Sequence, residues 1–197
     1  MKRLASAVAV LAVALTVGSC ATGKDAVVVG GQFEFVAPGG QQTILYDPPS
    51  VRGAVTSFSG ESLTDPDKQI GIQDYPGKVV VINVWGSWCG PCRAEVNDLQ
   101  LVADQLGPQG VAVLGLDVRD ARAAASDFVR DRHLTYQSIF DPAGRALLGL
   151  AGYPRNVVPS TIVLDRDHRV AAVYLTRLRL AEFMRVAQRI ATEPAAP

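Results

Sequence analysis

The chain has 197 residues, of which 48% are hydrophobic and 19% charged, so it has room for one ordinary globular domain and is not a disordered tail. The 19 basic and 19 acidic side chains cancel, with no run of like charge, which argues against a nucleic-acid-binding surface. Three cysteines are too few for a disulfide-rich scaffold, and their odd number leaves one outside any pair.

The N-terminus has the pattern of a secretory signal. Two basic residues precede an uninterrupted small-apolar run from Leu4 to Val17, which is too short to span a bilayer as a helix. We therefore expect residues 1–19 to be a signal peptide. Val17-Gly18-Ser19-Cys20 resembles the bacterial lipobox, which implies a lipid on Cys20 that anchors the protein outside the cell membrane. The alternative is an ordinary signal peptide that happens to contain a cysteine.

Residues 20–52 have the composition of a tether, because they are rich in Gly, Pro and polar residues and lack a helical period. Within them, residues 33–36 and 43–46 are short β-type runs separated by a Pro-Gly-Gly turn signal, which predicts a β-hairpin. We expect a lipid-anchored tether with an N-terminal β-hairpin extension, followed by a folded domain over residues 53–197.

The folded domain has the element order of an α/β protein. Residues 79–85 and 111–118 are nearly continuous apolar runs, typical of strands buried on both faces, and a helical stripe follows each of them. This alternation implies a parallel βαβ core. The complete order predicts a central mixed sheet flanked by helices on both faces, with strands at 79–85, 111–118, 136–140, 161–164 and 170–175 and helices at 91–106, 121–129, 143–150 and 180–190.

A Cys-Gly-Pro-Cys sequence lies where the first buried strand ends and the first helix begins. A thiolate at a helix N-terminus faces unpaired N–H groups and the positive end of the helix dipole, which lower the pKa of the thiol. This predicts Cys89 as the nucleophile. Cys92 lies one turn inside the helix and can attack a mixed disulfide formed by Cys89, which is the resolving role. Pro91 suits the first helical turn, where its missing N–H costs nothing.

Two other uses of the cysteine pair remain open. A zinc site needs four ligands, but the chain has no second cysteine pair, and its two histidines show no ligand spacing. A purely structural disulfide across two residues closes too short a loop to stabilise the fold much. We expect no metal and no cofactor, because the sequence also lacks a dinucleotide-binding fingerprint.

The sequence resembles the thioredoxin superfamily in two motifs, Trp88-Cys89-Gly90-Pro91-Cys92 after a Val/Ile-rich strand and Val158-Pro159-Ser160-Thr161 before the predicted hairpin. Three further details resemble its membrane-anchored extracytoplasmic branch, typified by ResA, TlpA and CcmG. Asn83 stands where cytoplasmic thioredoxins usually carry a buried Asp. Trp85-Gly86-Ser87-Trp88 matches the aromatic run of that branch, and Glu95 matches its active-site glutamate. The combination resembles an actinobacterial lipoprotein with a thioredoxin-like fold.

The resemblance implies roles for four further residues. Glu95 would raise the pKa of a neighbouring thiol and relay a proton during exchange, whereas an isolated Glu would be an exposed helix charge. Pro159 would be a cis-proline beside the disulfide, the alternative being a trans proline at a strand edge. The backbone of Val158 would pair with an extended substrate segment, and Trp88 would line the same substrate-binding surface.

The resemblance also implies a function and partners. A Gly-Pro dipeptide between the cysteines is shared with thioredoxin, a reductant, which favours reduction of disulfides in exported proteins such as the Cys-x-x-Cys-His haem-attachment sites of apocytochrome c. Electrons would come from a membrane thiol transporter of the CcdA or DsbD type, and we expect a monomer. The alternatives are a disulfide oxidase or isomerase for exported proteins and a non-enzymatic copper chaperone or binding module.

Overall fold

The computed structural model describes residues 31–36 and 38–194. Its centre is a six-stranded sheet of order β1-β8-β7-β4-β5-β6. Strands β4, β5 and β6 are parallel, whereas β7, β8 and β1 continue the sheet in antiparallel pairs. A separate antiparallel pair, β2 and β3, lies before the central strands in the chain. The strands are β1 Thr43–Leu45, β2 Ser59–Glu61, β3 Gln69–Gly71, β4 Val79–Trp85, β5 Val111–Asp117, β6 Gln137–Phe140, β7 Ser160–Leu164 and β8 Val170–Tyr174.

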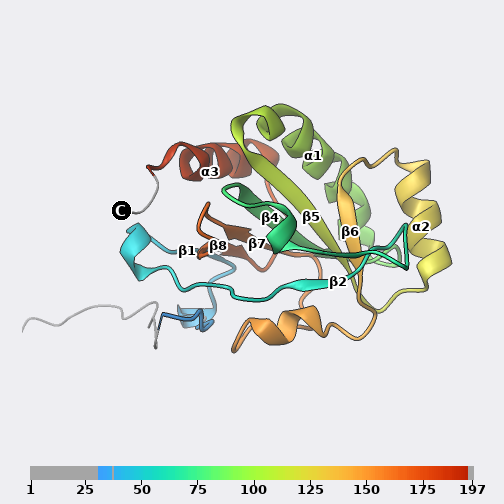
Figure 1. Cartoon of the computed structure of the whole chain (residues 1–197), viewed down its shortest axis with the longest axis horizontal. Coiled ribbons are helices and arrows are strands. Elements are labelled where there is room, and N and C mark those ends of the chain that lie inside the picture. Colours follow the sequence, from blue (N-terminus) through green and yellow to red (C-terminus); the bar gives the residue numbers. More distant parts are fainter. Residues whose placement is uncertain (1–30, 37, 195–197) are drawn as a thin grey trace, which may run out of the picture.

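The α-helices pack on one face of the sheet (Figure 1). They are α1 Gly90–Leu106, α2 Arg122–Asp131 and α3 Leu180–Thr192. The opposite face is covered by the N-terminal segment and by a 3-10 helix, Ala146–Gly149, which replaces the predicted helix at 143–150. The mixed sheet and its helices confirm the predicted thioredoxin-like α/β fold. The prediction of helices on both faces is wrong in part, because the N-terminal segment, and not a second α-helix, covers most of the other face.

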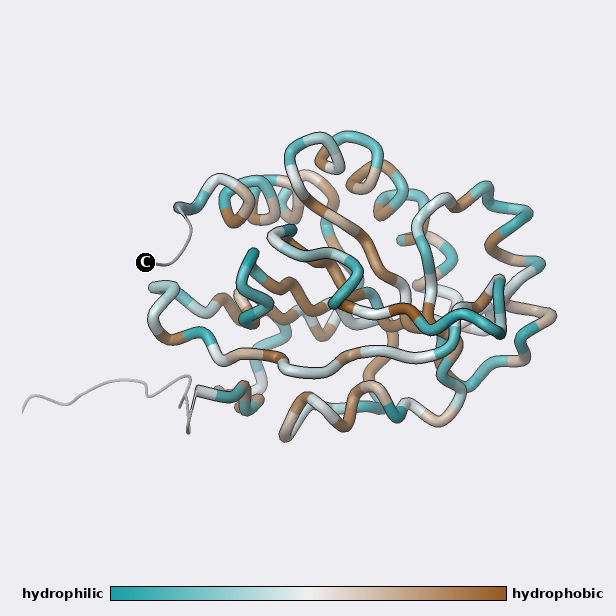
Figure 2. The backbone as a smooth tube through the Cα atoms, viewed as in Figure 1, coloured by the Kyte–Doolittle hydropathy of each residue, from teal (hydrophilic) through white to brown (hydrophobic). Residues whose placement is uncertain are grey.

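The central strands are apolar because both of their faces are covered. Every residue of β4 is buried, with Val79 and Val81 facing the helices and Val80 and Ile82 facing the N-terminal segment. Figure 2 shows the hydrophobic colour concentrated along the strands and the hydrophilic colour along the outer turns. Burial on both faces keeps the end of β4, which leads into the predicted site, in a fixed position.

The predicted N-terminal hairpin is wrong. Strand β1 pairs with β8, with Thr43 opposite Tyr174, and not with residues 33–36. The N–H of Phe33 donates to Ala54 O at 3.1 Å, and that of Phe35 donates to Ala151 O at 2.7 Å. Both runs carry alternating apolar residues, and the large open face of the sheet buries these side chains better than a two-stranded hairpin would.

The segment from residue 32 onward therefore belongs to the folded domain and is not a tether. A buried arginine fastens this segment to the rest of the protein. Arg52 is 4% exposed, and its guanidinium contacts Asp165 at 3.2 Å, Glu193 at 2.6 Å and Asp47 at 3.1 Å. Its Nε also donates to Tyr46 O at 3.0 Å. The cluster joins the N-terminal segment to the β7–β8 turn and to the end of α3.

We expect the Arg52→Met substitution to lower the free energy of unfolding by about 2 kcal/mol or more, because it removes a buried guanidinium that donates to three carboxylates and a backbone carbonyl. Arg169 and Arg189 still pair with these carboxylates, which limits the loss.

The matched control is Arg130→Met, since Arg130 pairs with Asp127 and Asp131 but its side chain is 70% exposed. The control should cost less than about 1 kcal/mol. Urea denaturation of both variants measures the difference. Equal losses of unfolding free energy would show that the buried Arg52 cluster stabilises the fold no more than an exposed ion pair does.

Candidate active site

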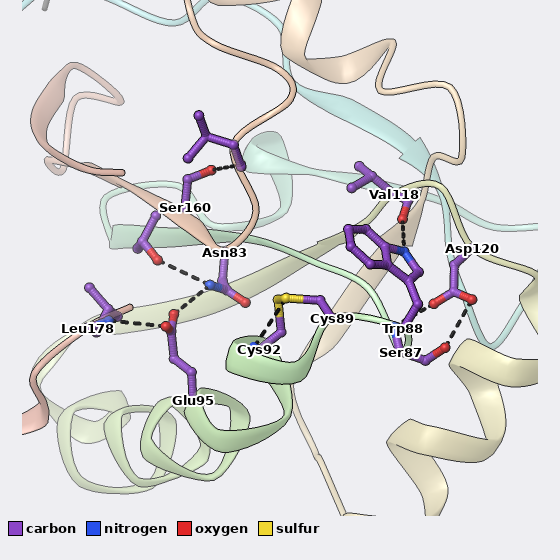
Figure 3. The surroundings of a disulfide bond; sticks show 12 residues. Asn83, Ser87, Trp88, Cys89, Cys92, Glu95, Val118, Asp120, Ser160 and Leu178 are labelled. Atoms are coloured by element: carbon purple, nitrogen blue, oxygen red, sulfur yellow. Dashed lines mark hydrogen bonds between the residues drawn. A yellow bond between two sulfur atoms is a disulfide. The ribbon is translucent and has the colours of Figure 1, made fainter. Parts of the chain in front are cut away.

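The two cysteines of the predicted site form a disulfide at the N-terminus of α1 (Figure 3). The Sγ–Sγ distance is 2.08 Å, and the residues Cys89 and Cys92 are 3% and 2% exposed. Cys89 is the N-cap residue of α1, and its sulfur accepts a hydrogen bond from the backbone N–H of Cys92 at 3.2 Å. Pro91 lies in the first turn of the helix, as the sequence predicts.

This placement favours Cys89 as the sulfur that carries negative charge. The N–H of Cys92 already points at its Sγ, and the positive end of the α1 dipole lies beside it. Both effects stabilise a thiolate and lower the pKa of a thiol at this position. Burial of the same sulfur opposes them, because a charge costs more away from water.

Glu95 is buried below the disulfide and is not an exposed helix charge. The residue is 1% exposed, and its Oε1 accepts a hydrogen bond from Asn83 Nδ2 at 2.9 Å. Its Oε2 accepts from the backbone N–H of Leu178 at 3.1 Å. Asn83 Nδ2 also donates to Thr161 Oγ1 at 3.1 Å. Figure 3 shows the Glu95 carboxylate directed toward Asn83 and Leu178.

Burial raises the pKa of Glu95 to about 7, even though the Leu178 N–H and the Asn83 amide stabilise its ionised form. The charge of Arg177 acts in the same direction as these donors, but Arg177 is bound to Asp98 at 3.6 Å. A carboxyl group with a pKa near 7 exchanges protons readily at neutral pH. Glu95 can therefore accept or release a proton while the neighbouring thiols react.

The peptide bond between Val158 and Pro159 is cis, as the resemblance implied. Pro159 is buried immediately before β7, whose first residue, Ser160, lies opposite Val84 of β4. This register places Pro159 at the same edge of the sheet as the loop that leads to Cys89. Val158 is half-buried and packs against the cluster that contains both cysteines.

Trp88 lies on the surface immediately before the disulfide. It is 49% exposed, and its Nε1 donates to Val118 O at 3.1 Å. The guanidinium of Arg119 lies 4.7 Å from the centre of the Trp88 ring, as a cation–π contact. Arg119 has a φ of 53°, in the left-handed region that non-glycine residues rarely occupy. The exposed indole is thus held in a defined orientation beside the disulfide.

Several residues of the site were not assigned roles from sequence. From sequence, Asn83 is only a marker of the family resemblance, and Leu178 contributes a backbone N–H that no sequence pattern reveals. Asp120 accepts hydrogen bonds from Ser87 N and Ser87 Oγ, which fixes the loop before Cys89. The sequence did contain a signal for this loop, because Ser87 and Asp120 are polar residues that follow the ends of the buried strands β4 and β5.

Some predictions concern residues that the structure does not describe. The signal peptide at 1–19 and the lipid on Cys20 lie outside the described residues. No helix within residues 31–36 and 38–194 has the length and apolar character needed to cross a membrane. The same ranges contain no group of three or more His, Cys, Asp or Glu side chains arranged to hold a metal ion.

Comparison with known proteins places this site among thiol-disulfide enzymes. A family model described as Redoxin matches residues 51–182. The thiol:disulfide interchange protein DsbE of Pseudomonas aeruginosa is 30% identical over 145 residues, which cover 71% of this chain and 77% of the relative. The thiol-disulfide oxidoreductase ResA of Bacillus thuringiensis is 28% identical over 52% of this chain and 58% of its own length.

Solved structures give a similar result. A secreted thiol-disulfide isomerase from Corynebacterium glutamicum superposes with a TM-score of 0.80 and 41% identity, covering 83% of this chain and all of the neighbour. A DsbF homologue from Corynebacterium diphtheriae superposes with a TM-score of 0.76 and 43% identity over 81% of this chain and 99% of the neighbour. The matches favour an enzyme over the copper-chaperone alternative.

Replacing Glu95 with Gln tests its buried ionisation in the oxidised protein. The folded protein holds the Glu95 proton up to about pH 7, whereas the ordinary pKa is 4.5. The proton on Glu95 therefore contributes fully to the free energy of unfolding below pH 4.5. This contribution is lost as the pH rises through 7. Between these limits we expect the wild type to lose about 3 kcal/mol more unfolding free energy than Glu95→Gln.

Urea denaturation at a series of pH values measures this difference. The control is Glu34→Gln, which removes an exposed carboxylate far along the chain and should follow the wild-type curve. Parallel curves for the wild type and Glu95→Gln would contradict a buried, proton-holding Glu95.

Proposed function

Because the chain belongs to the Redoxin family and is a thiol-disulfide oxidoreductase, we propose that it reduces disulfides in exported proteins on the outer side of the cell membrane. The observation that carries this proposal is the cysteine pair at the N-terminus of α1, with the proton-holding Glu95 one turn further along the helix. We propose the apocytochrome c haem-attachment site as the substrate, because the resemblance to the ResA, TlpA and CcmG branch implies it and relatives named DsbE and ResA match this chain.

The reaction proceeds through a mixed disulfide. The Cys89 thiolate attacks one sulfur of the substrate disulfide, and the other substrate sulfur leaves as a thiolate that takes up a proton. Cys92 then loses its proton and attacks Cys89 Sγ, which releases the second substrate thiol. Two electrons pass from the dithiol to the substrate, and the enzyme ends with the Cys89–Cys92 disulfide. Glu95 is the group positioned on α1 to accept the Cys92 proton.

The surroundings of the cysteines support a reductant. A strongly oxidising pair needs a thiolate that is much more stable than the disulfide, as in the periplasmic oxidant with a potential of about −120 mV. Here the Cys89 sulfur is almost fully buried, and the carboxyl group of Glu95 lies on the same buried side of α1. Both features make the thiolate less stable. The dithiol is then oxidised to the disulfide more readily, which makes it a stronger reductant.

The substrate would bind across the exposed edge that surrounds the disulfide. Trp88 presents half of its surface there, and Val158 and the cis-Pro159 lie at the end of the neighbouring strand. We propose that an extended substrate segment contacts the Trp88 ring and forms backbone hydrogen bonds with Val158. Such pairing would align the substrate disulfide with Cys89 through main-chain contacts.

The location and the electron donor belong to the same proposal. Removal of residues 1–19 and lipidation of Cys20 would hold the domain beside membrane-embedded partners. A membrane thiol transporter of the CcdA or DsbD type would then regenerate the dithiol, since the chain has no dinucleotide fingerprint. The secreted corynebacterial neighbour supports an extracytoplasmic location.

A second candidate is a disulfide isomerase or oxidase. The favouring observation is the 41% identity with a structure described as a secreted thiol-disulfide isomerase, which exceeds the identity with the curated DsbE and ResA relatives named above. An isomerase uses the same Cys89 attack, but it releases the substrate with a rearranged disulfide and keeps its own dithiol. The midpoint potential separates the reductant from the oxidase.

We expect a midpoint potential near that of thioredoxin, about −270 mV, measured by equilibration with glutathione or dithiothreitol buffers. Alkylation in intact cells should then find the Cys89–Cys92 pair reduced. A potential above about −150 mV together with a stably oxidised pair would overturn the reductant proposal in favour of the oxidase.

The Cys92→Ser variant should trap the substrate. Without the resolving thiol, the mixed disulfide at Cys89 persists and can be isolated under non-reducing conditions and identified by mass spectrometry. The control is Cys89→Ser, which lacks the attacking sulfur and should trap nothing. Capture of apocytochromes c supports the proposed substrate, whereas capture of many unrelated exported proteins would contradict it.

A further inference from the structure

A positively charged side chain lies on the exposed edge beside the disulfide. The guanidinium of Arg119 lies 4.7 Å from the centre of the Trp88 ring, and Trp88 immediately precedes the attacking Cys89. Trp88 is 49% exposed and Arg119 is exposed as well, so a bound protein can reach both side chains. Figure 3 shows the Trp88 indole directed toward Val118, the residue before Arg119. A substrate segment that contacts Trp88 therefore meets this positive charge.

The backbone around Arg119 fixes the place of the charge. Its φ of 53° is unfavourable for any residue other than glycine. The Arg119 N–H donates to Pro142 O at 3.1 Å, and the carbonyl of Val118 accepts from Trp88 Nε1 at 3.1 Å. One short segment thus holds both the indole and the cation over its ring. Because glycine would adopt this φ more easily, the backbone alone gives no reason for an arginine here.

The Arg119 guanidinium has no carboxylate partner within residues 31–36 and 38–194. Arg122, three residues further on, differs in this respect, because it pairs with Glu61 at 2.6 Å. Asp120 directly follows Arg119, but its carboxylate accepts from the N–H and the hydroxyl of Ser87. The N–H groups of Arg119 therefore remain available for an acceptor on another molecule.

Further positive charges lie close to the disulfide in the sequence. Arg93 directly follows Cys92 on α1, and its guanidinium lies 5.8 Å from the centre of the Phe128 ring. Arg155 lies four residues before the cis-Pro159. Both arginines are exposed, and neither forms an ion pair with the part of the chain that the structure describes. Two more elements next to the site thus carry positive charge.

A guanidinium held on an aromatic ring is well suited to bind a carboxylate. The group has five N–H donors in a fixed planar arrangement, and two of them match the two oxygens of a carboxylate. The contact with the ring restricts the arginine side chain before any anion binds, so less conformational entropy is lost on binding. Among protein groups, the side chains of aspartate and glutamate present two such oxygens.

We propose that Arg119 is a specificity residue that binds an acidic side chain of the protein substrate close to the reacting cysteine. The substrate carboxylate forms a bidentate ion pair with the guanidinium, which Trp88 supports from the other side. An extended chain advances about 3.3 Å per residue, so the acid lies within about four residues of the substrate cysteine. The inference rests on the proposed contact between the substrate and Trp88, and it applies to either direction of electron flow.

The reduced protein and a set of peptides test the proposal. Each peptide has one cysteine in a neutral mixed disulfide with 2-mercaptoethanol and carries Glu, Gln or Lys at one of the neighbouring positions. At low salt we expect the best Glu peptide to react about fivefold faster than its Gln counterpart, and the Lys peptide to react more slowly than both. Quenched flow and chromatography measure the loss of the mixed disulfide. Equal rates for the three peptides at every position would overturn the proposal.

The salt dependence of the wild type is a readout that needs no variant. A carboxylate that binds on an exposed arginine is screened by ions, so the preference for the Glu peptide should shrink to less than about twofold at about 0.5 M salt. A preference that stays the same at high salt would contradict an ion pair on this surface.

Two variants assign the preference to Arg119. Arg119→Gln should bring the rate of the Glu peptide down to that of the Gln peptide, and leave the latter within about twofold of the wild type. Arg119→Glu should reverse the order, so that the Lys peptide reacts fastest. The matched control is Arg185→Gln, which removes an exposed charge on α3 and should keep the wild-type preference. A Glu preference that survives Arg119→Gln would refute the role of Arg119.

The neutral Gln peptide separates this inference from the proposed function. If the wild type reduces the Gln peptide but shows no preference for Glu, the proposed function stands and the inference fails. If it reduces none of the peptides, both fail. An equal loss with all peptides in Arg119→Gln, together with a shifted pH dependence, would show that the cation acts on the Cys89 thiolate and not on the substrate.

Discussion

The active site depends on the buried hydrogen bond between Asn83 and Glu95. It connects the centre of β4 to the first turns of α1, and Glu95 extends the connection to the backbone of Leu178. These contacts orient the inner face of α1, on which Cys92 also lies, against the sheet. Because Asn83 is neutral, the only charge that this network has to bury is that of Glu95, and a proton on Glu95 removes it.

Two carboxyl groups buried in the folded domain, Glu95 and Asp117, hold their protons to neutral pH. Glu95 is hydrogen-bonded to Asn83 of β4. Asp117, the last residue of β5, lies opposite Trp85, the last residue of β4. Burial raises the pKa of both, to about 7 and about 8. In the proposed reaction, Glu95 is the group that exchanges protons with the thiols. Burial and the neighbouring carboxyl group oppose the stabilisation of a Cys89 thiolate by the N-terminus of α1, and the proposed reductant role depends on that opposition.

The sequence reveals the parts of the fold that local pattern determines. The apolar runs of β4 and β5, the Cys-Gly-Pro-Cys turn into α1 and the proline before β7 were all predicted, because each is encoded within a few neighbouring residues. The pairing of β1 with β8 and the Arg52 cluster were not, since they join segments more than a hundred residues apart. The Leu178 N–H was missed as well, because only the folded chain brings this group to Glu95.

Our central proposal is that Cys89 is the exchanging sulfur and that the buried Glu95 on the same helix controls its ionisation. The most direct measurement is the pH dependence of alkylation at each cysteine in the reduced protein, followed by mass spectrometry. We expect Cys89 to be labelled first, and its rate profile to shift toward lower pH when Glu95 is replaced by Gln. Preferential labelling of Cys92, or a Cys89 profile that is unchanged by Glu95→Gln, would contradict the proposal.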